Sequence, residues 1–157
     1  MIQRTLIQSI IVLLMLCPFV LTQAQAQAQS CEKIIRSVNE RLSPRINEKE
    51  LVEVLRHLNA TDHKKLPPHF LNKREARSWG WRPGKDLWSV KGLRGSSIGG
   101  DRFHNREGQL PHDQWREADL DYRGGRRGGK RLVYSRSGNR FVTVDHYQTF
   151  LEVPPCE

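Results

Sequence analysis

The sequence is poor in the residues that bind metals or carry redox chemistry. Its 157 residues include three cysteines and six histidines, with no CxxC or HExxH motif and no histidine spacing typical of a metal site. These absences exclude a zinc enzyme of the HExxH type and a CxxC oxidoreductase, and we expect the protein to use no metal or cofactor. There is no internal repeat either, which excludes a repeat architecture.

A long unbroken hydrophobic run is also missing. The most apolar stretch, residues 6–21, is interrupted by polar residues and a proline and is too short to span a bilayer. Arg4 precedes it, and an alanine–glutamine segment with the A-x-A pattern of a cleavage site follows at residues 23–29. We therefore expect residues 1–28 to be a signal peptide and the mature protein to be secreted, into the periplasm or the medium, with no membrane attachment. An uncleaved anchor is the alternative.

The expected export determines which cysteines the mature protein keeps and whether they are expected to pair. Cys17 would leave with the signal peptide, and Cys31 and Cys156 would remain near the two ends of the mature chain. Two cysteines in an oxidising compartment most simply form a disulfide. Such a bond would close nearly the whole domain in one loop and contribute on the order of 4 kcal/mol in the chain-entropy model. Lipidation of Cys31 is the alternative, although the residues before it lack the leucine of a lipobox.

Acidic residues are fewer than basic ones. The chain has 26 lysines and arginines against 17 aspartates and glutamates, with a formal net charge of +9 and a pI near 9.9. In a secreted domain this excess points to a polyanionic partner such as nucleic acid, an anionic membrane or acidic glycans. Charge alone does not choose among them, and a solvated basic surface without a partner agrees with it equally well.

Helical patterns fill the first half of the mature chain. Residues 32–42 place four aliphatic side chains on one face and predict a short helix within an N-terminal extension, residues 29–46. Two capping-box patterns, Asn47 with Glu50 and then residues 72–75, open further helices.

The pattern changes beyond Ser96. Short segments of strand-forming residues, separated by turn residues, predict strands at residues 97–103, 114–120, 130–135, 141–144 and 150–153. A tight turn at residues 136–139 would join two of them as a hairpin. Helices followed by hairpin-linked strands indicate an α+β fold, with the N-terminal helices packed on one face of an antiparallel sheet. We expect residues 47–157 to form one domain.

Five motifs occur in the order found in one family of enzymes. They are HKKLPPHFLNKREA…GW (residues 63–81), SIGGDRFHNREGQLP (97–111), WREADLDY (115–122), R…RLVYS (127–135) and DHYQTF (145–150). Together they closely resemble the barnase-like family of secreted, guanyl-preferring bacterial ribonucleases, over about residues 47–153. The N-terminal extension, the two terminal cysteines and a shorter loop at residues 110–115 depart from the family pattern, and none of these touches a motif residue.

The resemblance implies a catalytic set. Glu117 of WREAD matches the family's general base, and His146 of DHYQ matches its general acid. Arg127 and Arg131, ten and fourteen residues after the carboxylate, match two arginines that bind the phosphate. Lys73 of NKREA matches a lysine that supports the transition state.

The resemblance also implies substrate contacts. Asp101 of GGD is the expected partner of the Lys73 side chain, and Tyr147 is expected to line the phosphate site. The guanine-recognition loop is matched by Phe103, His104, Asn105, Arg106 and Glu107. The carboxylate of Glu107 can accept hydrogen bonds from guanine N1–H and N2–H, a pairing that adenine does not offer. His104 stands where the family pattern has a serine.

These residue types suit metal-free cleavage of RNA. A carboxylate can take the proton of the 2′-hydroxyl, an imidazolium can protonate the leaving 5′-oxygen, and guanidinium groups can hold the phosphate charge. The nucleophile then belongs to the substrate, which restricts the reaction to RNA. We therefore expect an endoribonuclease that cleaves single-stranded RNA 3′ of guanosine through a 2′,3′-cyclic phosphate.

Each residue also has a plainer interpretation. Taken alone, Glu117 is more often a cross-strand salt-bridge partner, His146 a structural residue, and the basic run at residues 123–131 a disordered loop that binds RNA without cutting it. The alternative function is therefore that of a non-catalytic, cationic RNA- or membrane-binding protein. By analogy with the family, the enzyme would be a monomer and would suit an acidic, barstar-like protein inhibitor.

Overall fold

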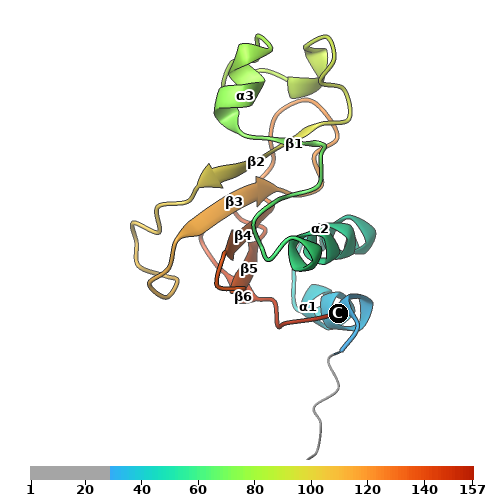
Figure 1. Cartoon of the computed structure of the whole chain (residues 1–157), viewed down its shortest axis with the longest axis vertical. Coiled ribbons are helices and arrows are strands. Elements are labelled where there is room, and N and C mark those ends of the chain that lie inside the picture. The colour runs from blue at the N-terminus through green and yellow to red at the C-terminus, as the bar shows by residue number, and fades with distance from the viewer. Residues whose placement is uncertain (1–28) are drawn as a thin grey trace, which may run out of the picture.

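Two helices cover one face of a six-stranded sheet in the computed structural model, which describes residues 29–157; the expected signal peptide lies outside the described residues. The helices are α1 (Cys31–Glu40) and α2 (Glu48–Ala60) (Figure 1). The strands follow one another in the sheet as in the chain: β1 (Phe70–Leu71), β2 (Ser97–Arg102), β3 (Trp115–Asp119), β4 (Arg131–Ser135), β5 (Arg140–Thr143) and β6 (Leu151–Glu152). Only β1 and β2 pair in parallel, and every other neighbouring pair is antiparallel. The arrangement confirms the α+β prediction.

Two shorter elements separate β1 from β2. They are α3 (Lys73–Ser78) and the 3₁₀-helix η1 (Leu87–Ser89), and α3 lies at the opposite end of the molecule from α1 (Figure 1). They pack on a small core of their own that includes Trp81 and Ile98. β1 was not predicted, because two residues are too few to show the alternation of a strand. Within residues 29–157, no helix is long and apolar enough to cross a membrane.

The capping patterns differ in how completely they form. At α3 the predicted box is complete, since Asn72 and Glu75 each accept a hydrogen bond from the other's backbone N–H. At α2 the Asn47 side chain accepts from the Glu50 backbone N–H, but the Glu50 carboxylate does not return the bond. It accepts instead from the Asp121 backbone N–H at 3.0 Å and pairs with Arg123 at 2.7 Å. Glu50 therefore connects the start of α2 to the start of the basic loop, residues 123–131.

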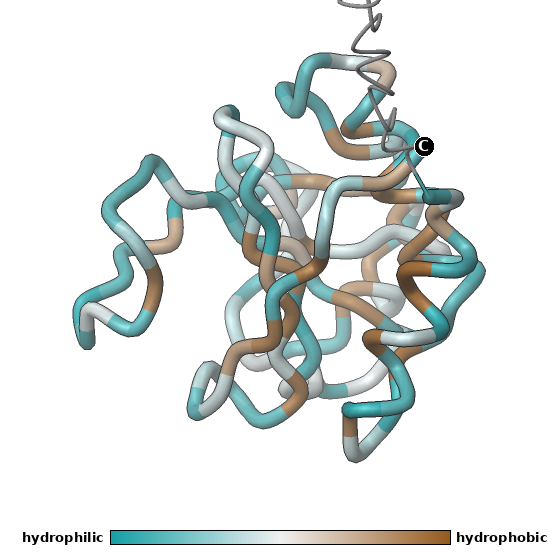
Figure 2. The backbone as a smooth tube through the Cα atoms, turned by 90° about the horizontal axis from the view of Figure 1, so that it is seen from below, coloured by the Kyte–Doolittle hydropathy of each residue, from teal (hydrophilic) through white to brown (hydrophobic). Residues whose placement is uncertain are grey.

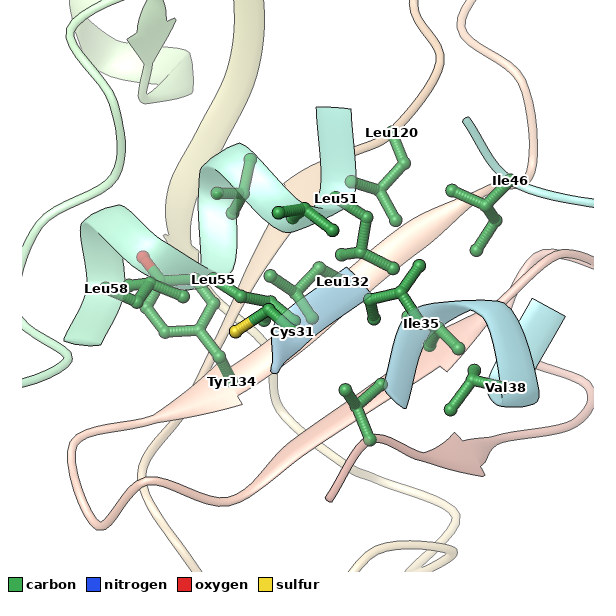
Figure 3. Close-up of a cluster of buried hydrophobic side chains, with 14 of the residues drawn as sticks. Cys31, Ile35, Val38, Ile46, Leu51, Leu55, Leu58, Leu120, Leu132 and Tyr134 are labelled. Atoms are coloured by element: carbon green, nitrogen blue, oxygen red, sulfur yellow. The ribbon is translucent and has the colours of Figure 1, made fainter. Parts of the chain in front are cut away.

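The main core lies between the two N-terminal helices and the sheet. Figure 3 shows Ile35 of α1 and Leu51 and Leu55 of α2 gathered with Leu132 and Tyr134 of β4, and all five side chains are buried. In Figure 2 the hydrophobic segments of the helices lie toward the strands and the hydrophilic ones toward the outside. Burial of each large aliphatic side chain contributes about 1.5–3 kcal/mol. The N-terminal extension is therefore a packed part of the same fold.

A disulfide joins the two ends of the described chain. Cys31 and Cys156 are bonded, with their Cα atoms 4.7 Å apart, as the sequence predicted. Backbone hydrogen bonds flank the bond: Cys31 N–H donates to Glu157 at 2.9 Å, and Glu157 N–H donates to Gln29 at 3.0 Å. The Asn59 side chain adds a bond to the Cys156 carbonyl at 2.8 Å. The disulfide thus fastens the C-terminal segment to the first residue of α1.

Reduction of this disulfide is expected to lower the melting temperature and to leave cleavage of RNA measurable. The bond restricts the unfolded chain, and its loss removes on the order of 4 kcal/mol in the chain-entropy model. The proposed catalytic residues all lie between Lys73 and Tyr147, away from the bond. Thermal melts with and without a thiol reductant measure the effect, and a double Cys31→Ser, Cys156→Ser variant should melt low and show no response to reductant. Free thiols or a lipid on Cys31, seen by mass spectrometry of unreduced peptides, would contradict the pairing.

Candidate active site

The face of the sheet opposite the helices carries two buried carboxylates. Side chains of β3 alternate between the two faces, so Ala118 packs into the helix-covered core while Glu117 and Asp119 point to the other side. Both carboxylates are buried there among basic groups. The WREAD motif therefore places two acids on one face, of which the sequence analysis identified only Glu117.

Glu117 is held by two hydrogen bonds. Lys73 Nζ donates to Oε1 at 2.8 Å, and the Tyr147 hydroxyl donates to Oε2 at 2.5 Å. Burial by itself would raise the pKa of Glu117, but the bonds from Lys73 and Tyr147 and the positive charges of Lys73 and Arg131 hold that pKa below the ordinary value of a glutamic acid. Glu117 is therefore ionised at neutral pH, as a general base must be.

Lys73 reaches Glu117 from the first residue of α3. A cation is electrostatically unfavourable at a helix N-terminus, and the contact with Glu117 compensates for it. The family resemblance implied that Asp101 would pair with the Lys73 side chain. In the structure Asp101 Oδ2 accepts from the Lys73 backbone N–H at 2.9 Å, and the ammonium group goes to Glu117. Asp101 therefore anchors the start of α3 on β2, which positions the lysine.

Replacing Lys73 by methionine is expected to move the acidic limb of the pH profile of kcat/KM to higher pH. A base acts in its ionised form, so activity is lost as the pH falls through the pKa of Glu117. Lys73 holds that pKa down, and without it burial raises the pKa. Profiles measured on a dinucleotide test this, with Arg74→Met, an exposed neighbour on α3, as the matched control. An acidic limb that stays in place would contradict the role given to Lys73.

Asp119 organises the two predicted phosphate arginines. Arg127 forms a fork on this carboxylate, with Nε to Oδ2 at 2.5 Å and a terminal nitrogen to Oδ1 at 2.6 Å. Arg131 Nε lies 2.9 Å from the same Oδ1 and also donates to the Tyr147 hydroxyl at 3.2 Å. Because Asp119 is only 2% exposed, the pairing is sheltered from water. The signal for Asp119 was its place two residues after Glu117, which puts both on the same face of a strand.

The loop that carries His146 has an unusual backbone. His146 and Tyr147 have consecutive positive φ angles of 57° and 67°. The Asp145 carboxylate stabilises this conformation by accepting from Thr143, the Gln148 N–H and both the N–H and hydroxyl of Thr149. Despite some cost of burial, these bonds hold the pKa of Asp145 at about 2. Asp145 is thus a positioning residue that the motif contains but the sequence analysis did not single out.

The His146 ring lies against the backbone of the basic loop. A Cβ at Gly129 would come within 2.6 Å of His146 Nδ1, and the His146 N–H donates to the Gly129 carbonyl at 3.3 Å. Only glycine fits at this contact. His146 is otherwise exposed. The contact brings the predicted acid to the loop that lies between Arg127 and Arg131.

The predicted recognition loop borders the same region. Phe103 stacks on Tyr147 with ring centroids 5.2 Å apart, and Gln109 donates to the Tyr147 carbonyl at 3.3 Å. Asn105 shapes the loop rather than facing outward, because its side chain bonds both the N–H and the carbonyl of Leu110. The other three members, His104, Arg106 and Glu107, are exposed.

The fold therefore gathers the predicted site residues into one region. Glu117 directly contacts Lys73 and Tyr147, Arg131 contacts Tyr147, and Arg127 joins through Asp119. Among residues 29–157, no group of three or more histidine, cysteine, aspartate or glutamate side chains is placed to hold a metal ion.

Comparisons with known proteins identify ribonucleases as relatives of this chain. A family model described as ribonuclease matches residues 56–154. A ribonuclease of Heyndrickxia coagulans is 44% identical over 95 residues, which cover 58% of this chain and 85% of that protein. Ribonucleases of Bacillus intermedius and Bacillus pumilus are also 44% identical over 95 residues, and the match spans 57% of the length of each.

The matched span contains every predicted catalytic residue, and it leaves out α1 and the disulfide, which are the features that the motifs had set apart. On the evidence of the family model and these relatives, the chain belongs to the barnase-like family of bacterial ribonucleases.

Proposed function

We propose that this ribonuclease-family enzyme is an exported endoribonuclease that cleaves RNA 3′ of guanosine without a metal ion. One observation carries the proposal. Glu117 is an ionised, buried carboxylate beside Lys73 and Arg131, on the sheet face that also meets the loop of His146. A base, an acid and fixed cations at one place form the set that transfer of a phosphoryl group to a 2′-hydroxyl requires.

The first step of the proposed reaction is an internal attack. Glu117 takes the proton of the guanosine 2′-hydroxyl as the 2′-oxygen attacks phosphorus, and His146 protonates the departing 5′-oxygen. The carboxylate oxygens keep acceptor capacity for this proton because each is engaged by one donor only. Arg127, Arg131 and Lys73 stabilise the charge that builds on the phosphorane oxygens. In the second step the roles reverse: His146 activates water, Glu117 returns its proton, and the cyclic phosphate opens to a 3′-phosphate.

Incubation of RNA with the purified protein in EDTA tests the proposal. We expect cleavage, with early products ending in guanosine 2′,3′-cyclic phosphate and later products ending in guanosine 3′-phosphate. Binding without cleavage would support the alternative of a non-catalytic RNA-binding protein. Cleavage after all four bases at similar rates would contradict the guanosine preference alone. N-terminal sequencing of the protein recovered from the periplasm and the medium tests export and the site of signal cleavage.

Replacing Glu107 by glutamine is expected to lower the ratio of kcat/KM for guanosine over adenosine by roughly ten- to a hundred-fold. The amide keeps the shape but replaces one acceptor oxygen by a donor, and a mismatched polar pair costs about 1–3 kcal/mol. Cleavage after adenosine should change little. GpU and ApU assayed side by side measure the ratio, and Glu53→Gln, an exposed glutamate on α2, is the control. An unchanged ratio would remove Glu107 from the recognition site.

A further inference from the structure

Three arginines gather on the sheet face opposite Glu117. Arg116 lies between Trp115 and Glu117 in β3, so its side chain points away from Glu117, to the side on which Ala118 meets the helices. Arg102 of β2 is directly opposite Arg116 in the register and shares that side. Arg136, which follows β4, lines with them a cleft of about 280 Å³. We call Arg102, Arg116 and Arg136 the arginine cluster.

The arginine cluster has no acidic counterpart. Within residues 29–157, none of the three forms an ion pair. The one hydrogen bond that their side chains donate to the protein runs from Arg116 to the Gly100 carbonyl at 2.5 Å. Asp113, in the loop before β3, is engaged by Ser137 and Asn139 of the neighbouring turn.

Like charges directly opposite each other on antiparallel strands destabilise a sheet. A local arrangement that works against the fold is expected where the residues serve another purpose. All three arginines are exposed and are able to meet an anion.

Basic character continues from the cluster into a second cleft. Arg116 also lines a neighbouring hollow of about 250 Å³, together with Lys64 and Lys65. Lys64 Nζ lies 3.1 Å from Oδ2 of the exposed Asp62. Glu75, which borders the same hollow, uses its carboxylate in the cap of α3. The positive surface thus extends over two adjoining clefts.

The arginine cluster begins where the recognition loop begins. Arg102 is the residue before Phe103, whose ring stacks on Tyr147 beside Glu117. The Arg102–Arg116 pair lies one position along the β2–β3 ladder from the pair formed by Asp101 and Glu117. A chain that leaves the cleavage site past this loop would reach the cluster by passing around the end of the β2–β3 ladder, where residues 103–114 join the two strands.

We propose that the arginine cluster is a second RNA-binding site, which holds phosphates of a polymeric substrate outside the dinucleotide that is cut. The inference rests on the proposed function in taking RNA as the substrate. Guanidinium groups bind phosphates through paired hydrogen bonds, and the clefts offer three of them in a row. A membrane surface is a poorer fit, because interfacial binding uses exposed apolar side chains. The one large hydrophobic side chain exposed in residues 29–157 is Trp79, at the end of α3 and outside both clefts.

The test compares substrates of two lengths in a triple variant, Arg102→Gln, Arg116→Gln and Arg136→Gln. Its kcat/KM is measured on GpU and on a 20-nucleotide RNA with a single guanosine, at 50 and 200 mM salt. We expect a loss of roughly ten-fold or more on the 20-mer at 50 mM salt and a salt dependence shallower by about two in log–log slope, since about 0.7 is lost per phosphate contact on a single strand. The rate on GpU should be that of the unaltered protein.

Matched variants make the result specific. Lys33→Gln, Arg36→Gln and Arg41→Gln remove the same charge from the exposed side of α1 and its end, and should keep the preference for the 20-mer. Replacing the cluster by three lysines keeps its charge and should restore most of the salt dependence. Equal losses on both substrates, an equal loss in the α1 variant, or an unchanged 20-mer rate would each overturn the proposal.

Two further measurements separate this inference from the proposed function. Cleavage of neither substrate by the unaltered protein would refute the proposed function. The cluster would still be tested by fluorescence anisotropy with a 20-mer that carries a 2′-deoxyguanosine, which the triple variant should bind more weakly. Loss of binding to phosphatidylglycerol vesicles, with 20-mer cleavage and binding unchanged, would assign the cluster to membranes and contradict the proposal.

Discussion

Replacing Glu117 by glutamine is expected to lower kcat for RNA cleavage by about 10²–10⁴-fold, the usual contribution of a positioned acid or base. The amide keeps the volume of the side chain and still accepts from Tyr147, but it has no charge with which to take the 2′-hydroxyl proton. Affinity for RNA should change little, because Arg127 and Arg131 remain paired with Asp119 and keep their positions. Single-turnover rates and binding of a 2′-deoxy substrate separate the two quantities.

The control for this variant is Glu152→Gln, an exposed glutamate on β6 that removes the same charge away from the site. It should cleave RNA at the unaltered rate. Turnover of the Glu117→Gln variant at the unaltered rate would refute the assignment of the base. A loss of affinity as large as the loss of kcat would instead make Glu117 a residue that orders the site.

Replacing His146 by asparagine is expected to lower kcat on RNA by about 10²–10⁴-fold and to have a much smaller effect on a substrate with a good leaving group. The acid matters when a poor leaving group, the 5′-alkoxide, needs a proton. In the 4-nitrophenyl ester of guanosine 3′-phosphate the leaving group is 4-nitrophenolate, which departs without a proton. Asparagine is chosen because His146 has a φ of 57°, a conformation that asparagine tolerates better than most residues.

Equal losses of kcat on the two substrates would show that His146 is structural. His57→Asn, on α2, provides the matched control and should leave both rates unchanged. Melting curves of both variants show whether the loop that Asp145 holds together has been disturbed.

The sequence predicted the main elements because each is marked by a local pattern. The N-caps Asn47 and Asn72 start helices as expected, and the alternation around Glu117 gives a strand. Other features depend on distant partners. Glu50 has the spacing of a capping box, yet its carboxylate bonds to residues more than 70 positions later. No local pattern reports such a contact.

In the candidate site, too, some features follow from local sequence and others depend on contacts between distant residues. Residue types and the family resemblance predicted roles for Glu117 and His146. They did not predict the pairing of Lys73 with Glu117 or the fork of Arg127 on Asp119, because both pairings depend on how side chains meet across the sheet. The family resemblance implied Asp101 as the partner of the Lys73 ammonium. The capping requirement of α3 draws that carboxylate to the backbone instead.

The pairing of Arg127 and Arg131 with one carboxylate sets the charge that the substrate meets. With the imidazole left aside, Lys73 and the two arginines bring three positive charges, and Glu117 and Asp119 bring two negative ones. These five groups together therefore have a net charge of +1, equal and opposite to that of one phosphodiester. In the proposed mechanism Glu117 accepts the 2′-proton, so the net charge of these groups becomes +2 as the phosphorane becomes a dianion. The protein thus gains attraction for the substrate in step with the reaction, which favours the transition state over the bound diester.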